Sequence, residues 1–567
     1  MTQTRWIFRS AAAPADVARL EQELKLPAAL CRLLVVRGLS DPEAAKRWLR
    51  PRLDQLHEPG ALVTMTNAVA RLGRALDARE TILVHGDYDV DGMCATTLLV
   101  SVLRALGGTA VPFIPHRLTD GYDLGEAGVR AAQAAGAGLV VTCDCGTSAH
   151  RAIDALRASG IDVIVSDHHL PGGPLPECVA VLNPKRPDAV TGDRDLVAVG
   201  VAFHLARALV AARGADERHA LRHLDLVALA TVADVGALRG ENRALVREGL
   251  RVLAATTRPG LRALIRSSGL DGKAMTAGRV GFTLAPRLNA AGRLGSAMRG
   301  VELLLAADDD TANRIARELE ELNRTRQAMD RDTLDAARDQ VAHRGLDDAW
   351  GFVLAGEGWH PGVVGIVASR IVEEFGRPAV LVAMDGETGK GSGRSISAFD
   401  LHAGLGECRD LLLRYGGHRV AAGVTIERKQ VAAFRDRFNA VAKQQLTPDD
   451  LVPELRADLE LPLGEVTDDL ERLLRHGEPW GVANPTPVFV ARGVTVAERP
   501  RVMKGEHLRL RLSEGTAALD AIGWRLAERG AALREGDRVD VAFQIERDTW
   551  GGRDALQLKL ADLRAAG

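Results

Sequence analysis

The sequence predicts an α/β protein of several domains, and three features of its 567 residues point to this class. From about residue 80, apolar runs alternate with amphipathic stretches, which is the pattern of a parallel sheet with crossover helices. Residues 308–344 lack glycine and proline and are densely charged, as expected for one long helix. From residue 485, short segments alternate apolar and polar residues between turns, which predicts a small barrel or sandwich.

The bulk composition is that of an ordinary globular protein, with 46% hydrophobic and 26% charged residues. We expect a cytoplasmic protein without membrane contact, because there is no signal-peptide core and no apolar run near the roughly 18 residues of a membrane span. Six scattered cysteines indicate free thiols rather than disulfides. A net charge of −2 excludes a globally basic nucleic-acid binder, so a polyanion would need a local groove.

The first α/β region contains four predicted strands, within "TILVHG" (81–86), "AVPFIPH" (110–116), "GLVVTCDCG" (138–146) and "DVIVSDHH" (162–169). The helix over 147–160 is expected to have Thr147 or Ser148 as its cap and to end at Gly160. A further apolar stretch, "LVALATVADVG" (226–236), is interpreted as another strand. Ligands of parallel sheets bind at the carboxyl ends of strands, so the side chains after these runs should converge.

Those side chains carry carboxylate and imidazole groups: Asp89, Asp91, Asp144, His168, His169 and Asp234. Such hard oxygen ligands with one or two histidines suit Mn²⁺ or Mg²⁺ better than a thiolate zinc site. Four carboxylates exceed the needs of one ion, so we expect two metal ions about 3.5–4 Å apart, the arrangement that hydrolyses phosphoesters.

Each motif alone has a simpler explanation. An Asp-x-Asp pair after a strand most often caps a turn or helix, and adjacent histidines are as often surface residues as ligands. Cys143 and Cys145 flank Asp144 and are interpreted as core packing. The occurrence of all these groups at predicted strand ends of one sheet favours a functional site.

The motifs "HGDYDVDG" (85–92), "DCG" (144–146), "SDHH" (166–169) and "ATVADVGAL" (230–238) resemble, in order and spacing, those of the DHH phosphoesterase superfamily. Downstream, "GWHPGVVGIVASR", "GSGRS" and "GGH" resemble its DHHA1 companion domain, and "APRLNAAGRLGSA" with "LNRTRQ" is similar to the branch of single-stranded-DNA exonucleases. The resemblance implies an N-terminal extension (1–75), a DHH catalytic domain (76–305), a connecting helix (306–345), a smaller α/β DHHA1 domain (346–445) and an OB-fold-like barrel that binds single strands (446–567).

The resemblance also implies metal ligation by Asp89, Asp91, Asp144, Asp234 and at least one of His168 and His169, while the other histidine contacts the scissile phosphate. His85 and Asp87 are further candidate ligands. The expected mechanism is in-line attack on phosphorus by a metal-activated water, without a covalent protein intermediate.

Recognition of a 5′ phosphate calls for arginines and backbone N–H groups. The resemblance assigns this pocket to Arg117, Arg293, Ser392 and Arg394, and we expect a phosphate-binding glycine nest around Ser392. Each of these arginines alone is more typical of a solvated or salt-bridged surface residue. His418 would line the groove between the two α/β domains, and Tyr122 and Trp359 are candidates for stacking on bases. "DGETGKGSGRS" lacks the spacing of a P-loop, so triphosphate hydrolysis is not indicated.

The predicted barrel strands carry clustered basic side chains, which are interpreted either as a solvated face or as a track for a single strand: Arg499, Arg501, Lys504, Arg509 and Arg511.

The resemblance therefore implies a 5′-to-3′ exonuclease that degrades single-stranded DNA to 5′-mononucleotides in DNA repair and recombination. Candidate partners are single-stranded DNA with a 5′ end, a single-strand-binding protein and a helicase, and the expected state is a monomer. One alternative is a DHH hydrolase of short oligoribonucleotides or cyclic dinucleotides. Another is a non-catalytic scaffold that binds single strands during replication.

Overall fold

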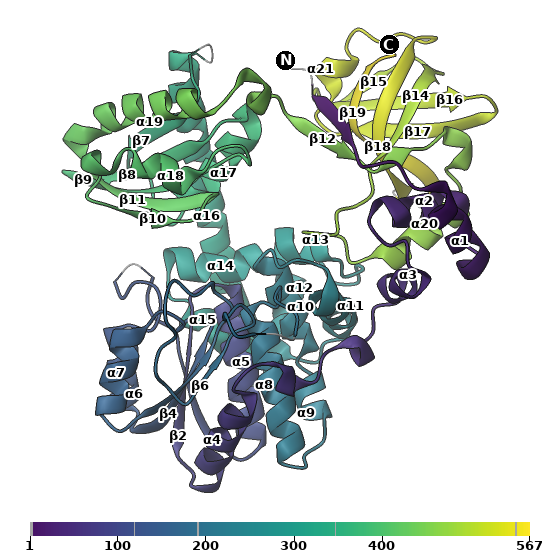
Figure 1. Cartoon of the computed structure of the whole chain (residues 1–567). Coiled ribbons are helices and arrows are strands. Elements are labelled where there is room, and N and C mark those ends of the chain that lie inside the picture. Colours follow the sequence, from purple (N-terminus) through teal and green to yellow (C-terminus); the bar gives the residue numbers. More distant parts are fainter. Residues whose placement is uncertain (1–3, 118, 190–191, 346–347, 550–552, 567) are drawn as a thin grey trace. The chain divides into compact units, whose positions relative to one another are not determined.

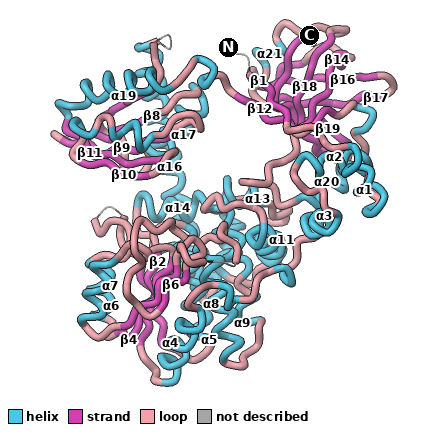
Figure 2. Tube along the Cα trace, viewed as in Figure 1, coloured by secondary structure: helices cyan, strands magenta, loops and turns pink. Residues whose placement is uncertain are grey.

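The computed structural model describes residues 4–117, 119–189, 192–345, 348–549 and 553–566. The chain forms two compact units. The larger unit holds residues 57–236 and 240–452, and the smaller unit holds residues 1–56, 237–239 and 453–567. Figure 1 labels the elements of both units, and Figure 2 shows their helices and strands.

The larger unit contains a fully parallel five-stranded sheet of order β3-β2-β4-β5-β6, which confirms the predicted fold class. Its strands are β2 (Thr81–Gly86), β3 (Thr109–Phe113), β4 (Ala137–Cys143), β5 (Asp162–Ser166) and β6 (Ala180–Leu182). One face is covered by α4 (Met65–Asp77), α5 (Val90–Ala105) and α8 (Ala198–Ala212), and the other by α6 (Glu126–Ala134) and α7 (His150–Ala158) (Figure 1). Because β3 and β4 pair on opposite sides of β2, a crevice for ligands is expected at the carboxyl ends of β2 and β4.

Helices complete this part of the larger unit. They are α9 (Arg218–Leu221), α10 (Leu224–Ala233), α11 (Gly240–Ala254), α12 (Pro259–Ser267), α13 (Ala277–Arg279), the π-helix η3 (Val280–Leu284), α14 (Ala285–Leu294) and α15 (Met298–Leu305). The prediction of a strand over 226–236 is wrong, since most of this stretch belongs to α10. Eight of the ten α10 residues are buried, and an apolar run buried on all sides has no periodicity that separates helix from strand.

The predicted cap of α7 is also wrong. The residue before α7 is Ala149, which makes no side-chain cap, whereas the backbone N–H of Thr147 donates to Asp167 Oδ2. The predicted end is right, because Gly160 follows the helix with a φ of 73°.

The long helix is confirmed as α16 (Asp309–Arg344), with Asp308 as its N-cap and Ile315 and Leu319 buried. It leads into a second sheet of order β10-β11-β9-β8-β7. The strands are β7 (Phe352–Glu357), β8 (Ala379–Asp385), β9 (Thr388–Arg394), β10 (Arg414–Gly417) and β11 (Ala421–Glu427). α17 (Val364–Phe375) packs with α16 on one face, and α18 (Leu401–Gly406) and α19 (Val431–Gln445) pack on the other.

The smaller unit is built on a barrel of β14 (Phe489–Val496), β18 (Arg538–Asp548), β19 (Ala555–Ala565), β17 (Ala517–Gly523) and β16 (His507–Glu514). Antiparallel pairing of β14 with β16 closes it, which confirms the predicted barrel. Short strands extend the sheet, namely β13 (Leu459–Glu460) and β15 (Arg501–Met503), and α20 (Asp468–Leu474) packs beside it.

The first 56 residues belong to this barrel unit. β1 (Arg5–Phe8) pairs with β12 (Glu454–Ala457), and Trp6 Nε1 donates to Asp562 Oδ2 at 2.8 Å. α1 (Pro14–Leu24), α2 (Ala28–Val36) and α3 (Pro42–Leu49) place Leu30, Leu33 and other apolar residues in the barrel core. The N-terminal segment and the barrel therefore share one hydrophobic core.

All six cysteines have free thiols, and five of them are buried, as predicted. No helix in the described ranges is long and apolar enough to span a membrane.

Candidate active site

The turn between β2 and α5 and the first turn of α5 together carry three aspartates at the carboxyl edge of the parallel sheet, Asp87, Asp89 and Asp91. Asp89 caps α5, and its Oδ1 accepts from the N–H groups of Asp91 at 2.9 Å and Gly92 at 3.1 Å. Gly92 is required here because a Cβ at this position would lie 2.5 Å from Asp87 N. The turn thus folds tightly enough to direct several carboxylates to one place.

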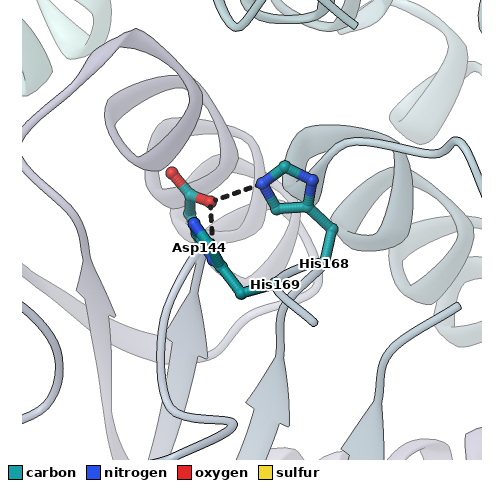
Figure 3. A group of neighbouring side chains, drawn as sticks. All are labelled: Asp144, His168 and His169. Carbon is teal, nitrogen blue, oxygen red and sulfur yellow. Dashed lines mark ion pairs between the residues drawn. The ribbon is translucent and has the colours of Figure 1, made fainter. Parts of the chain in front are cut away.

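Asp144 follows β4 and has a φ of 67°, in the left-handed region that is costly for a residue other than glycine. Its Oδ1 lies 3.1 Å from Nε2 of His168 and 3.8 Å from Nδ1 of His169, the two histidines after β5 (Figure 3). Its backbone N–H donates to Ser166 O, which ties the two strand ends together. The unusual backbone therefore turns this carboxylate toward both imidazoles.

Asp234 comes from the carboxyl end of α10 rather than from a strand, and Val235 after it has a φ of 58°. His168 Nε2 lies 3.7 Å from Asp234 Oδ2 and 3.9 Å from Asp91 Oδ2. Within the described ranges, three groups of side chains each have ligand atoms within 4.8 Å of one another. They are Asp144, His168 and His169; Asp91, His168 and Asp234; and Asp87, Asp89 and Asp144.

The electrostatics of this cluster favour bound cations. Burial and the neighbouring carboxylates raise the pKa of Asp91 and Asp144 well above the usual range, and they raise the pKa of Asp234 to about 7. Oδ1 of Asp144 and Oδ1 of Asp87 are buried without a hydrogen-bond donor. Crowded, repelling carboxylates with free oxygens fit hard divalent cations, which would remove the repulsion.

The two histidines differ in their surroundings. Burial lowers the pKa of His168 to about 3, so its contacts with the carboxylates are those of a neutral imidazole rather than ion pairs. Burial also opposes protonation of His169, but its hydrogen bond to Asp167 outweighs this and raises its pKa. The side chain of His169 is 44% exposed and lies within hydrogen-bond distance of the Tyr122 hydroxyl. His168 is thus suited to bind metal, and His169 to face an incoming ligand.

His85 lies outside the three groups. It is fully buried, its Nδ1 lies 3.5 Å from Cys145 Sγ, and its ring packs against Phe113. Burial lowers its pKa to about 4, and Gly128 leaves room for the ring, since a Cβ there would lie 2.7 Å from it. Its Nε2 is buried without a hydrogen-bond partner among the described residues. Because His85 belongs to none of the three groups, we leave it out of the proposed ligand set, whereas Asp87 remains in it.

Three of the predicted phosphate-binding residues form an arginine cluster in the larger unit, which we define as Arg117, Arg293 and Arg394. The Arg117 guanidinium lies over the ring of Tyr88, 4.7 Å from its centroid. Arg293 donates from Nη1 to Gly362 O at 2.9 Å, and burial together with Arg117 and other arginines lowers its pKa to about 10. Burial and Arg117 also lower the pKa of Arg394. Mutually repelling guanidinium groups favour an anionic ligand among them.

The glycine nest expected around Ser392 is absent, because residues 388–394 form β9 in the described sheet. The glycines serve packing: a Cβ on Gly391 would meet Val424, and one on Gly393 would meet Leu401. Ser392 still belongs with the arginine cluster, because its Oγ accepts from Arg394 Nη1 at 3.0 Å.

The two other predicted substrate contacts, His418 and Trp359, belong neither to the carboxylate cluster nor to the arginine cluster. His418 is exposed in the turn between β10 and β11, where its N–H donates to Ala421 O, and Ala421 is paired with Arg394 in the sheet. Trp359 is partly buried and packs against Gly356 and the hydrophobic core of the second sheet.

On the barrel, part of the predicted basic track is neutralised. Arg509 and Arg511 both donate to Asp520, at 2.9 and 2.8 Å, and Arg511 also lies near Glu498. Arg499 and Arg501 lie in a stretch before β16, and the Arg501 side chain is exposed.

A cavity of about 720 Å³ opens on the same barrel, lined by Lys504, Arg509, Trp524 and neighbouring residues. The Trp524 side chain is half exposed and packs edge-on against His507. The sequence does not single out Trp524, because one tryptophan after an apolar strand is equally typical of core packing.

Comparison with known proteins agrees with this architecture. The profile of the DHH family N-terminal domain matches residues 81–231, the DHHA1 domain matches 348–444, and the RecJ OB domain matches 457–562. With the acidic cluster at the edge of the parallel sheet, these matches make the protein a member of the DHH superfamily.

Relatives over the whole chain define the particular family. The chain is 37% identical to the single-stranded-DNA-specific exonuclease RecJ of Dickeya dadantii, over 96% of this chain and 97% of the relative. It is 36% identical to RecJ of Bacillus subtilis, over 96% of this chain and 69% of the relative. A crystal structure of RecJ from Thermus thermophilus in complex with Mn²⁺ superposes with a TM-score of 0.86 and 34% identity, covering 100% of this chain and 80% of that one. The chain belongs to the RecJ family.

Proposed function

We propose that this protein is a metal-dependent exonuclease that degrades single-stranded DNA from its 5′ end to 5′-mononucleotides. The observation that carries the proposal is that the larger unit contains both a buried carboxylate–imidazole cluster and the arginine cluster. The first suits phosphodiester hydrolysis, and the second suits a terminal phosphate. The naming of its full-length relatives as single-stranded-DNA-specific exonucleases supports the same function.

Two divalent ions, Mn²⁺ or Mg²⁺, are the proposed cofactors, and the RecJ structures with each of these ions support them. The proposed ligands are Asp87, Asp89, Asp91, Asp144, His168 and Asp234. When bound, such ions lower the pKa of a water and stabilise charge on the leaving oxygen.

The remaining residues orient the substrate. His169 is held by Asp167 and contacts Tyr122, and it would donate to a phosphate oxygen. Tyr122 is half exposed and presents its ring for stacking on a base. The arginine cluster with Ser392 would hold the 5′ phosphate, and His418 would contact the strand from the second sheet.

We further propose a monomeric enzyme that works with a single-strand-binding protein and a helicase in DNA repair and recombination. Free thiols throughout the chain support a cytoplasmic location.

Direct assay tests the proposal. The purified chain is given single-stranded DNA with a 5′ phosphate or a 5′ hydroxyl and blunt duplex DNA, each with Mn²⁺, Mg²⁺ or a chelator. We expect 5′-mononucleotides from the 5′-phosphorylated single strand only when metal is present. Release from the 3′ end, or equal cleavage of the duplex, would contradict the proposal.

The two alternatives have less support. A hydrolase of cyclic dinucleotides needs no single-strand-binding barrel, whereas residues 457–562 match the RecJ OB domain. A non-catalytic scaffold would not need the carboxylate and imidazole groups that lie close together in the described part of the chain. Hydrolysis of dinucleotides but not of long strands would favour the first alternative. Binding of single strands without any hydrolysis would favour the second.

We propose that the barrel cavity with Trp524 contacts nucleotides of the single strand other than the one at its 5′ end. We expect Trp524→Ala to weaken binding of single-stranded DNA about 10-fold, because base stacking on an aromatic ring contributes about 1–3 kcal/mol. Fluorescence anisotropy with a long oligonucleotide measures this effect. Leu413→Ala, at an exposed apolar residue in the larger unit, is the matched control and should bind as the native chain does. Unchanged binding in Trp524→Ala would remove this cavity from the proposed path of the strand.

A further inference from the structure

A second cavity of the larger unit, of about 690 Å³, lies away from the carboxylate cluster. We call it the distal pocket and define it by Arg222, His223, Thr256, Arg258, Pro259 and Leu304. Its volume is within the range of about 300–1,000 Å³ that is typical of small-molecule sites.

The position of the distal pocket follows from the two helices that supply metal ligands. α10 is followed directly by Asp234 of the carboxylate cluster, and it is preceded directly by His223 of the distal pocket. α5 carries Asp91 in its first turn, and Ser101 farther along it lines the pocket. Because ten helical residues span about 15 Å, the pocket is separate from the site of hydrolysis.

The polar groups of the distal pocket are not all satisfied. Nδ1 of His223 lies 2.8 Å from Nη2 of Arg258, and Nε2 of the same ring lies 3.3 Å from Nε of Arg222. Burial and the two arginines lower the pKa of His223 to about 2, so the ring is neutral and has only one acceptor nitrogen. One of the two guanidinium groups must therefore face a ring N–H. We assign this position to Arg222, because its contact with the ring is longer than that of Arg258.

The two arginines differ in how they are held. Arg258 caps α15 by donating from Nη1 to Leu304 O, lies 3.6 Å from Asp225, and still has a buried Nε without a hydrogen-bond partner. Asp225 in turn accepts from the Thr256 hydroxyl at 2.9 Å. Arg222 is exposed at the rim of the pocket, and among the described residues the structure gives it one polar side-chain partner, His223. The single carboxylate in the lining is thus already engaged, and one cationic charge is left for a ligand.

We propose that the distal pocket is a second, non-catalytic binding site for a phosphate monoester of mononucleotide size. A phosphate oxygen placed between Arg222 Nε–H and His223 Nε2–H would accept from both donors that now face each other. The apolar part of the lining, which includes Val252, Pro259 and Leu304, offers a surface for a sugar or base. This inference does not depend on the proposed exonuclease activity.

Titration calorimetry of the full chain in chelator tests the proposal, with inorganic phosphate, dAMP and deoxyadenosine as probes. Because the arginine cluster is itself a proposed phosphate site, the native chain should bind two equivalents of dAMP. Arg394→Gln removes the other site and should leave one equivalent, with a dissociation constant of about 1 mM or lower. Arg222→Gln in that background should weaken the remaining site at least about 10-fold. dAMP should bind more tightly than phosphate, and deoxyadenosine should not bind.

Arg218→Gln is the matched control, since Arg218 is an exposed arginine at the start of α9 and is paired with Asp216. It should leave both equivalents unchanged. Crystals soaked in tungstate give a second readout, with density expected between Arg222 and His223. Loss of all binding in Arg394→Gln, or unchanged binding in the Arg222→Gln double variant, would overturn the proposal. Because neither readout measures hydrolysis, a chain without nuclease activity would leave this result standing.

Discussion

Replacement of Asp144 by asparagine is expected to lower kcat by at least about 10³-fold, which corresponds to roughly 4 kcal/mol of lost transition-state stabilisation. Asp144 belongs to two of the three ligand groups, and its Oδ1 is buried without a hydrogen-bond donor. An amide has no charge with which to hold a divalent ion there. Binding of 5′-phosphorylated DNA should persist, because the arginine cluster is untouched. Single-turnover rates with Mn²⁺ and filter binding in chelator separate the two effects.

A stability measurement adds a readout that is independent of turnover. Burial and neighbouring carboxylates raise the pKa of Asp144 in the folded chain, so its ionised form destabilises the fold at neutral pH. In chelator, Asp144→Asn should therefore have a higher Tm than the native chain. Mn²⁺ should raise the Tm of the native chain more than that of the variant, since a ligand stabilises the state that binds it.

Asp154→Asn is the matched control for this prediction, because Asp154 is an exposed carboxylate on α7, which packs on the same sheet. It should change neither kcat nor the metal-dependent shift in Tm. Full activity of Asp144→Asn would remove Asp144 from the metal site and with it the proposed mechanism.

Replacement of Arg293 by glutamine is expected to lower kcat/KM for 5′-phosphorylated single strands about 100-fold, since breaking a buried charge pair with a ligand costs roughly 2–5 kcal/mol. The rate on a 5′-hydroxyl strand should change only slightly, because the lost interaction is with the terminal phosphate. Arg394→Gln should act in the same direction, as Arg394 lies in the same cluster. The measurement is the ratio of kcat/KM for the 5′-phosphorylated strand to kcat/KM for the 5′-hydroxyl strand in each variant.

Arg151→Gln, at an exposed arginine of α7, is the control for loss of charge and should keep the native ratio. An Arg293→Gln variant that slows both substrates equally would mean that Arg293 acts only by tying α14 to the Gly362 loop. The 5′-phosphate assignment would then rest on Arg117 and Arg394 alone.

Much of the site can be predicted from the sequence because its signals are local. Aspartates and histidines stand directly after apolar strands, and in a parallel sheet all such positions meet at one edge. The structure places the groups that follow β2, β4 and β5 in three overlapping sets, each with ligand atoms within 4.8 Å of one another. These groups are Asp87, Asp89, Asp91, Asp144, His168 and His169. The long helix and the barrel are equally visible, since their composition and periodicity are properties of contiguous residues.

What only the tertiary structure decided depends on contacts between distant segments. The sequence predicts Asp234 at a strand end, but it comes from a helix, because an apolar stretch enclosed on all sides shows no period. His85 stands beside the acidic motif in sequence, yet its side chain lies near Cys145 and Phe113. The reason is that His85 still belongs to β2, whereas the aspartates come after the strand has ended.

Two further features are formed by segments that lie far apart in the chain, and nothing in the sequence predicts that these segments pack together. Residues 1–56 share a core with the barrel, and α10, α12 and α15 meet around the distal pocket. Sequence determined which chemical groups this protein has at its strand ends, because those positions follow from local periodicity. Packing over long separations decided which of these groups share a site.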